Sequence, residues 1–197
     1  MPEKPDLTAL IGSRICHDLI SPIGAIGNGV ELMLMEGAQS SPEMALIAES
    51  VAHANAKIRF FRLAFGAAAG ENSTARSEVV NVLSDITLGT RLRIDAQLQD
   101  RLPRASVKLT FLLVMCLETA MPFGGVIEIV QGEDRWTVRG KADRLKIDPA
   151  LWAGLSEGSS PDIGPSQVQF ALVSEELARQ HRRLTTEITS TEVRFCF

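Results

Sequence analysis

The chain has few cysteines, no excess of positive charge and no long hydrophobic run. Its three cysteines, Cys16, Cys116 and Cys196, are odd in number and far apart, which excludes a disulfide framework and a zinc knuckle. With 20 Lys and Arg against 24 Asp and Glu the net charge is −4, and this acidic balance argues against a nucleic-acid-binding surface. The longest charge-free apolar stretch, residues 109–117, is far shorter than the ~18 residues that a bilayer span requires.

The first six residues also lack the basic start and the apolar core of a signal peptide. With 45% hydrophobic residues in 197, the chain is long enough for one large domain or two small ones. Composition therefore predicts a folded, cytoplasmic protein that binds neither nucleic acid nor a membrane.

Two long helices are predicted in the N-terminal part of the chain. Residues 7–36 contain no stop signal apart from one proline, and residues 43–66 contain none. Between them, Gly37 suits a left-handed C-cap, and Ser41 or alternatively Ser40 suits an N-cap. So short a connection predicts an antiparallel hairpin.

Each of these helices carries an apolar stripe with alternating gaps of three and four residues, which is typical of a helix-bundle seam. In the second helix the stripe is Met44, Ile47, Val51, Ala54, Ile58, Phe61 and Phe65. In the first helix it is Ile15, Leu19, Ile23, Ile26, Val30 and Met33. Two helices alone cannot bury both stripes and the apolar residues that flank them, Leu10, Ile20, Phe60 and Leu63. A second copy completes a four-helix bundle, so the pattern predicts a homodimer.

The remainder of the chain predicts an α+β domain. Residues 66–77 are small and polar and are interpreted as a linker. Helices are expected over residues 78–88, 106–121 and 167–181, and strands over residues 91–97, 126–130, 135–139 and 185–197. The middle two strands resemble a hairpin that turns at residues 132–134, and the sheet is expected to be antiparallel. The chain is accordingly divided into residues 1–70 and residues 71–197.

Opposite its apolar stripe, the first helix has a second stripe of polar and small residues. Its members again recur with gaps of three and four: Arg14, His17, Ser21, Gly24, Asn28 and Glu31. His17 therefore points away from the bundle core. Pro22 lacks an N–H, so the carbonyl of Asp18, next to His17, has no intrahelical partner. A small exposed surface centred on one imidazole is the result.

Histidines on helices are mostly solvated side chains without a role, and the chain contains two such cases. His53 falls off the apolar stripe of the second helix, and His181 lies in the last turn of a predicted helix, where a positive charge is favourable. Neither is assigned a function. His17 differs from both because Arg14, Asp18, Ser21 and a proline inside the helix lie around it.

Three glycines follow His17 within the first helix, Gly24, Gly27 and Gly29. Each costs about 1 kcal/mol relative to alanine in a helix. Close approach of a neighbouring helix and a docking partner's need for a smooth surface would each explain them, and both interpretations stay open.

Residues 13–26, Ser-Arg-Ile-Cys-His-Asp-Leu-Ile-Ser-Pro-Ile-Gly-Ala-Ile, resemble the H-box of histidine kinase dimerisation domains, where His, an acidic residue and Leu precede two variable positions and Pro. Residues 17–32 are more specifically similar to the ChpT-type histidine phosphotransferases, and residues 60–66 fit the same family. The resemblance is strong over residues 1–70. Over the rest of the chain it extends only to the general arrangement of helices and strands. It implies a dimeric four-helix bundle of two hairpins, each hairpin followed by an α/β sandwich shaped like a histidine kinase ATPase domain.

The residues that a working ATPase domain needs are missing from the second half. Such a domain uses an N-box asparagine, an Asp-x-Gly-x-Gly segment and a glycine-rich lid. No asparagine occurs after Asn81, and residues 117–120, on the helix where the N-box should lie, contain none. The nearest match to the second motif, residues 162–165, lacks its second glycine. The domain is interpreted as a degenerate ATPase-like domain, with neither ATP binding nor autokinase activity expected.

The family relation implies a phosphotransferase in a two-component phosphorelay. A receiver domain of a hybrid histidine kinase passes a phosphoryl group from its aspartate to His17, and a response regulator, such as a CtrA-like regulator, takes it on. Neutral imidazole is a competent nucleophile near pH 7, and Nε2 is expected to react because it lies farther from the backbone. Asp18 is expected to fix the ring tautomer, Arg14 to screen phosphoryl charge or pair with the partner, and Ser21 to donate a hydrogen bond.

The receiver is expected to dock on the polar stripe and the apolar residues beside it. The candidate docking residues are Ile20, Gly24, Asn28 and Glu31. Mg²⁺ would come from the receiver, and no cofactor or metal of the protein's own is expected.

Two other functions stay open. One is a degenerate kinase that still binds ATP through unrecognised residues, which a nucleotide titration tests. The other is a non-catalytic dimeric scaffold that binds receiver domains, which incubation with a phosphorylated receiver tests. A metal hydrolase is a remote third, because the other two histidines lie on separate segments without ligand spacing.

Overall fold

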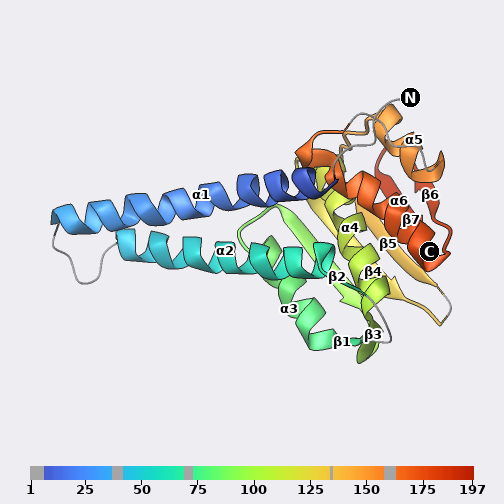
Figure 1. The fold of residues 1–197 in the computed structure, drawn as a ribbon, viewed down its shortest axis with the longest axis horizontal. Helices are drawn as coiled ribbons and strands as arrows, with labels where there is room; N and C mark the ends of the chain where they lie inside the picture. The colour runs from blue at the N-terminus through green and yellow to red at the C-terminus, as the bar shows by residue number, and fades with distance from the viewer. Residues whose placement is uncertain (1–6, 37–41, 69–72, 134, 158–162) are drawn as a thin grey trace.

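The computed structural model describes residues 7–36, 42–68, 73–133, 135–157 and 163–197. In Figure 1 a long helical hairpin extends from an α+β body, and the open ends of its two helices pack on that body. The α+β class and the N-terminal hairpin expected from the sequence are confirmed.

The hairpin consists of α1 (Leu7–Glu36) and α2 (Pro42–Phe65), which pack against each other along their length. Pro22 lies inside α1, and Pro42 is the first residue of α2, a position that tolerates its missing N–H. The capping interpretations at residues 37, 40 and 41 lie outside the described residues. No helix in the described part of the chain is long and apolar enough to span a membrane.

The body contains the remaining helices and strands. In chain order they are β1 (Ser73–Ala75), α3 (Arg76–Thr87), β2 (Leu92–Gln97), β3 (Arg101–Pro103), α4 (Arg104–Ala120), β4 (Gly125–Gln131), β5 (Trp136–Lys141), α5 (Pro149–Glu157), the 3₁₀ turn η1 (Pro165–Gln167), α6 (Val168–Gln180), β6 (Thr185–Ile188) and β7 (Glu192–Cys196). Their order and type agree with the predicted helices and strands wherever the sequence analysis placed one.

The main sheet has five strands in the order β2-β4-β5-β7-β6. Strands β4, β5, β7 and β6 pair antiparallel, but β2 pairs parallel with β4. The expectation of an antiparallel sheet was therefore wrong for one edge. The physical reason is the connection, because α4 crosses over between β2 and β4 and returns the chain in the same direction.

The interpretation of residues 66–77 as a linker was also wrong over its second half. Residues 73–75 form β1, which pairs antiparallel with β3, and residues 76–77 begin α3. Thr74 and Leu102 face each other across this pair and are both buried. A three-residue strand among small polar residues carries too little pattern to be recognised from sequence.

The end of α2 is buried against the body. Phe60, Phe61 and Leu63 belong to the same hydrophobic core as α4, and the Phe60 and Phe111 rings lie 4.9 Å apart between centroids. The sequence pattern alone assigns these three residues to contact with a second copy of the hairpin. The body covers them instead, because the apolar spacing indicates which face is buried but not which element buries it.

Polar contacts fix the same junction. Arg59 pairs with Asp85 on α3 at 2.7 Å, and Arg62 pairs with Glu78 at 2.9 Å. From α4, the Arg104 guanidinium donates to the Arg62 carbonyl oxygen at 2.8 Å. The hairpin is thus held in a defined position relative to the body.

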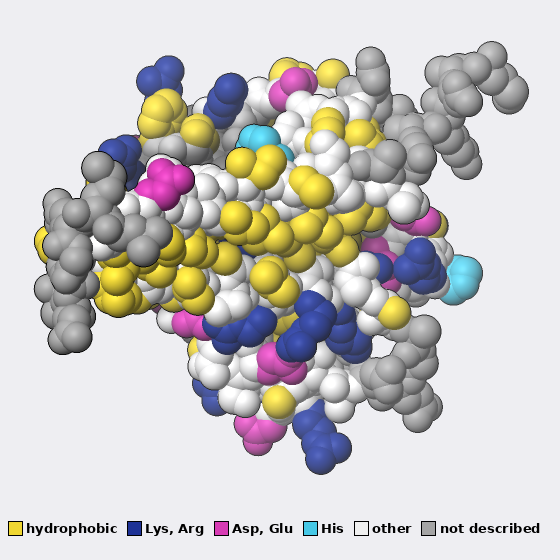
Figure 2. Space-filling model, turned by 60° about the vertical axis from the view of Figure 1, so that its left-hand side comes forward, with side chains coloured by type: hydrophobic (Ala, Val, Ile, Leu, Met, Phe, Trp, Pro, Cys, Tyr) yellow, Lys and Arg dark blue, Asp and Glu magenta, His cyan; other side chains and the backbone are white. Residues whose placement is uncertain are grey.

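Further from the body, the hairpin presents what we call the apolar band. The residues of the band are Ile23, Val30, Met44, Leu46, Val51 and Ile58, all exposed in the single chain. Figure 2 shows hydrophobic side chains running along this part of the molecule. Most of the band consists of the stripe residues that the sequence analysis assigned to a dimer interface.

Candidate functional site

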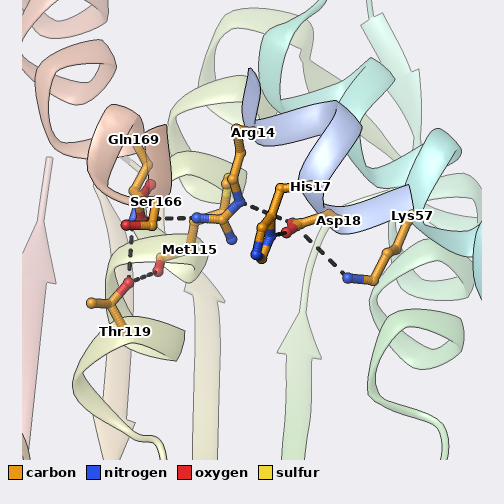
Figure 3. A network of polar contacts seen from close by, with 8 residues as sticks. All are labelled: Arg14, His17, Asp18, Lys57, Met115, Thr119, Ser166 and Gln169. Carbon is orange, nitrogen blue, oxygen red and sulfur yellow. Dashed lines mark hydrogen bonds and ion pairs between the residues drawn. The ribbon is translucent and has the colours of Figure 1, made fainter. Parts of the chain in front are cut away.

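His17 stands on the outside of α1, facing away from the protein. Its side chain is 83% exposed, and its Nδ1 lies 3.0 Å from Oδ1 of Asp18 (Figure 3). The ring is therefore both accessible to a partner protein and held at one of its two nitrogens. This is the orientation that the stripe of residues 14–31 predicts.

The Asp18 carboxyl is the acceptor that holds the ring. Burial works to raise the pKa of Asp18, but the hydrogen bond with His17 and the charges of Arg14 and Lys57 outweigh it, so this pKa lies below its ordinary value. An ionised carboxylate only accepts hydrogen bonds. In the neutral imidazole this contact favours the tautomer with the proton on Nδ1, which leaves the lone pair on Nε2.

Asp18 is itself held by two cations from different helices. Nε of Arg14 donates to Asp18 Oδ2 at 2.9 Å, and Nζ of Lys57 on α2 lies 3.9 Å from the same oxygen. Arg14 also donates from its terminal nitrogen to the carbonyl oxygen of Ser166 in η1, at 2.8 Å. The guanidinium thus bridges the His17 helix and the body (Figure 3). The predicted roles of Arg14 in screening phosphoryl charge or pairing with a partner stay predictions.

Beneath these residues lies a cavity of about 200 Å³ between the hairpin and the body. Arg14, Asp18, Lys57 and Glu118 bring their charges to its walls. Burial raises the pKa of Glu118 to about 7, with the Asp18 charge adding to the rise and Arg14 and Lys57 opposing it. Glu118 on α4 therefore titrates near neutral pH beside the residues that hold His17.

Replacing Glu118 by glutamine is expected to change how stability depends on pH. The folded protein holds the Glu118 proton up to about pH 7, whereas the unfolded chain loses it near its ordinary value of 4.5. Wild-type stability therefore falls as pH rises between these two values, and Glu118→Gln lacks this fall. At pH 8 we expect the variant to be more stable than wild type by about 2 kcal/mol, with little difference at pH 4.5.

Urea unfolding at both pH values and one protein concentration measures this difference. Glu133→Gln serves as a control, because Glu133 is an exposed glutamate in the turn between β4 and β5. If the difference in free energy of unfolding between wild type and Glu118→Gln is the same at pH 4.5 and pH 8, the raised pKa assigned to Glu118 is wrong.

The other residues of the predicted site also lie on the open surface of α1. Ile20 is 69% exposed, and Ser21, Gly24, Asn28 and Glu31 are exposed as well. They therefore share the accessible side of the helix with His17. Their contact with a receiver stays a prediction.

The structure separates the two interpretations of the helical glycines. A Cβ added at Gly29 would lie 2.5 Å from Cγ1 of Ile47 on α2, so this glycine permits close approach of the two helices. Added Cβ atoms at Gly24 and Gly27 would meet nothing within 4 Å. Helix packing explains Gly29 but not the other two, which lie on open surface.

Alanine at Gly24 and at Gly29 is expected to have opposite effects. Gly24→Ala should stabilise the protein by about 1 kcal/mol through helix propensity alone. Gly29→Ala should destabilise it by about 1 to 2 kcal/mol, because the new methyl overpacks against Ile47. Thermal and urea unfolding compare the two variants, and equal effects at the two positions would contradict the packing account.

Sequence reasoning missed Lys57, Ser166 and Glu118. Lys57 and Ser166 reach Asp18 and Arg14 from elements distant in the chain, and no local pattern signals such a contact. Glu118 could have been noticed in the sequence, because it is the one acidic residue in an otherwise apolar run on the buried helix α4.

Comparison with known proteins identifies the family. A family model described as the histidine phosphotransferase C-terminal domain matches residues 76–192. The protein phosphotransferase ChpT of Brucella abortus (strain 2308) is 35% identical over 163 residues, which cover 80% of this chain and 77% of that protein. This chain belongs to the ChpT-type histidine phosphotransferase family.

A solved structure agrees with this membership. Described as a bacterial phosphotransferase, it superposes on this histidine phosphotransferase with a TM-score of 0.80 and 31% identity, covering 100% of this chain and 97% of that one. The Acinetobacter baumannii histidine kinase AdeS superposes with a TM-score of 0.47 and 12% identity, covering 91% of this chain and 95% of that one. The family resemblance inferred from residues 13–32 and 60–66 is confirmed by the family model and the two phosphotransferases, and with it the assignment of the chain as a phosphotransferase.

Proposed function

We propose that His17 is the residue that carries the phosphoryl group in a multistep two-component phosphorelay. It accepts the group from a receiver aspartate of a hybrid histidine kinase and passes it to an aspartate of a response regulator. The observation that carries this proposal is an exposed imidazole whose Nδ1 lies 3.0 Å from the Asp18 carboxylate, a contact that favours the tautomer with its lone pair on Nε2. The name of the Brucella relative, protein phosphotransferase, supports a protein as the source and acceptor of the group.

In the first transfer the Nε2 lone pair forms a bond to phosphorus as the P–O bond of the aspartyl phosphate breaks. The receiver aspartate leaves as a carboxylate. The imidazole keeps its Nδ1 proton and gains positive charge, which the Asp18 carboxylate 3.0 Å away stabilises. The second transfer is the reverse reaction with another receiver. In such a reaction the protein mainly has to position the reacting groups and compensate the charge that develops on them. In this proposal the site around His17 does both.

The receiver docks on the outer surface of α1 around His17. Ile20, Gly24, Asn28 and Glu31 contact it, and Ser21, one turn after His17, lies within reach of the transfer site. Gly24 supports the assignment of this docking surface, because no packing contact within the chain explains a glycine at that position. The interface is small, as suits a transient exchange between partners. Mg²⁺ arrives with the receiver.

The partners include a CtrA-like response regulator, and the protein acts in the cytoplasm. A second copy of the chain covers the apolar band and completes a four-helix bundle. Exposed apolar area of this extent along one helical hairpin is typical of an interface between proteins.

The body does not bind ATP in this proposal. Its α4 segment at residues 117–120 carries Glu118 where a kinase N-box asparagine is expected, and Arg14 connects the body to the transfer site. A titration of the purified protein with ATP and Mg²⁺ tests this point. Micromolar binding would favour the degenerate-kinase alternative.

The proposal as a whole is tested by phosphotransfer from a receiver. Wild-type protein incubated with a ³²P-labelled receiver is expected to acquire the label and to release it to a second receiver. Label that never leaves the first receiver, across the cognate candidates, would favour the scaffold alternative.

A further inference from the structure

Gln169 is a buried amide at the start of α6, on the body side of the site. It is 0% exposed, and its Nε2 donates two hydrogen bonds, to the Ser166 carbonyl oxygen at 3.1 Å and to Oγ1 of Thr119 at 3.0 Å. Thr119 in turn donates to the Met115 carbonyl oxygen at 3.0 Å. The amide is thereby anchored to the backbone of α4.

The same Ser166 carbonyl oxygen accepts the hydrogen bond from Arg14. Gln169 therefore fixes the acceptor that fixes Arg14, and Arg14 fixes the Asp18 carboxylate at 2.9 Å. Asp18 holds His17 at 3.0 Å. Figure 3 shows this continuous path of polar contacts from the interior of the body to the imidazole.

Packing alone does not explain an amide at this position. The other amide atom of Gln169, Oε1, is buried and has no hydrogen-bond partner among the described residues. A buried polar atom without a partner costs free energy that an apolar side chain of similar size would avoid. What the amide contributes must then lie in the two groups that its Nε2 holds.

We propose that Gln169 is a positioning residue for phosphoryl transfer, acting on His17 through Ser166, Arg14 and Asp18. The proposal rests on the function proposed for His17. It assigns the body a role in the reaction that does not require a bound nucleotide, because the body positions the imidazole through Arg14 and Asp18. If the Ser166 carbonyl is not held in place, Arg14 keeps its hydrogen bond to Asp18 but loses the second hydrogen bond that orients its guanidinium.

The test replaces Gln169 by leucine, which keeps the volume and removes both donated hydrogen bonds. We expect the rate of transfer within the receiver complex to fall about tenfold, while the dissociation constant of the receiver is unchanged. The fold should be as stable as wild type or more stable. Thr119→Val, at an exposed position, removes one anchor of the amide with little risk to folding, and it should lower the transfer rate in the same direction.

Thr110→Val is the matched control. Thr110 is a buried polar residue of α4 whose Oγ1 also has no hydrogen-bond partner among the described residues, so it does not take part in the path from Gln169 to Arg14. This variant should leave transfer unchanged. If Thr110→Val slows transfer as much as Gln169→Leu, the effect is general to the core and the proposal fails.

A double-mutant comparison tests the path itself. In an Arg14→Met background, adding Gln169→Leu should have no further effect on the transfer rate, because the path is already broken. Independent, multiplying effects of the two substitutions would overturn the proposal.

Nitrogen NMR of the His17 ring gives a readout that does not depend on transfer. Wild type should show a proton on Nδ1, and Gln169→Leu should show a mixture of the two tautomers. An unchanged His17 spectrum together with an unchanged transfer rate overturns the positioning role. If wild-type protein takes no phosphoryl group at all, the proposed function fails, and the NMR comparison alone then decides whether Gln169 positions the ring.

Discussion

Replacing His17 by glutamine is expected to abolish phosphoryl acceptance and to leave stability almost unchanged. The amide has no nucleophilic nitrogen, and no other described histidine lies on the same surface of α1. Because the His17 side chain is 83% exposed and its polar contact is with its neighbour Asp18, its loss should change the free energy of unfolding by less than about 0.5 kcal/mol. Label transfer from a ³²P-labelled receiver measures the first effect, and urea unfolding measures the second.

His53→Gln is the matched control for this experiment. His53 lies on α2 of the same hairpin, so the substitution removes an imidazole from the hairpin but not from the outer surface of α1. It should accept label at the wild-type rate. Equal labelling of His17→Gln and wild type would place the phosphoryl group on another residue and refute the assignment.

A glutamate at Val51 is expected to dissociate the proposed dimer. Val51 lies in the middle of the apolar band and is 42% exposed in the single chain, so one hairpin has room to turn a glutamate at this position towards solvent. In a four-helix bundle the carboxylate would be buried without a partner, which costs about 3 to 5 kcal/mol. The dimer dissociation constant should then rise at least about a hundredfold.

Light scattering and sedimentation at micromolar concentration measure this change. Leu88→Glu is the control, because Leu88 is an exposed leucine on the body, outside the band, and its substitution should leave the dimer intact. A charge at Ile47 is a poorer test, since Ile47 packs against Gly29 inside each hairpin. A wild-type protein that is wholly monomeric, or a Val51→Glu variant that stays dimeric, would contradict the assignment of the band.

The long elements and the exposed histidine could be predicted from the sequence because their signals are local. Helix α1 shows two stripes with helical spacing, and the stripe that contains His17 is polar, so the outward direction of the ring follows from geometry alone. The hairpin of β4 and β5 and the buried helix α4 likewise showed strong local patterns.

What could not be predicted depends on contacts between distant segments. The strand β1 is recognisable only by its pairing with β3, and the parallel pairing of β2 with β4 depends on the path of the chain between them. The burial of Phe60 by the body has the same origin. At the site, Ser166 reaches Arg14 across 152 residues of sequence through a backbone oxygen, which no residue type reveals.

The most direct test of the central claim is the position of the phosphoryl group on the phosphorylated protein. Phosphorus and nitrogen NMR of protein labelled by its receiver distinguishes the two ring nitrogens of a phosphohistidine. We predict a phosphoryl group on Nε2 of His17, with the proton on Nδ1 facing Asp18. A phosphoryl group on Nδ1, or on any residue other than His17, would contradict this account of the site.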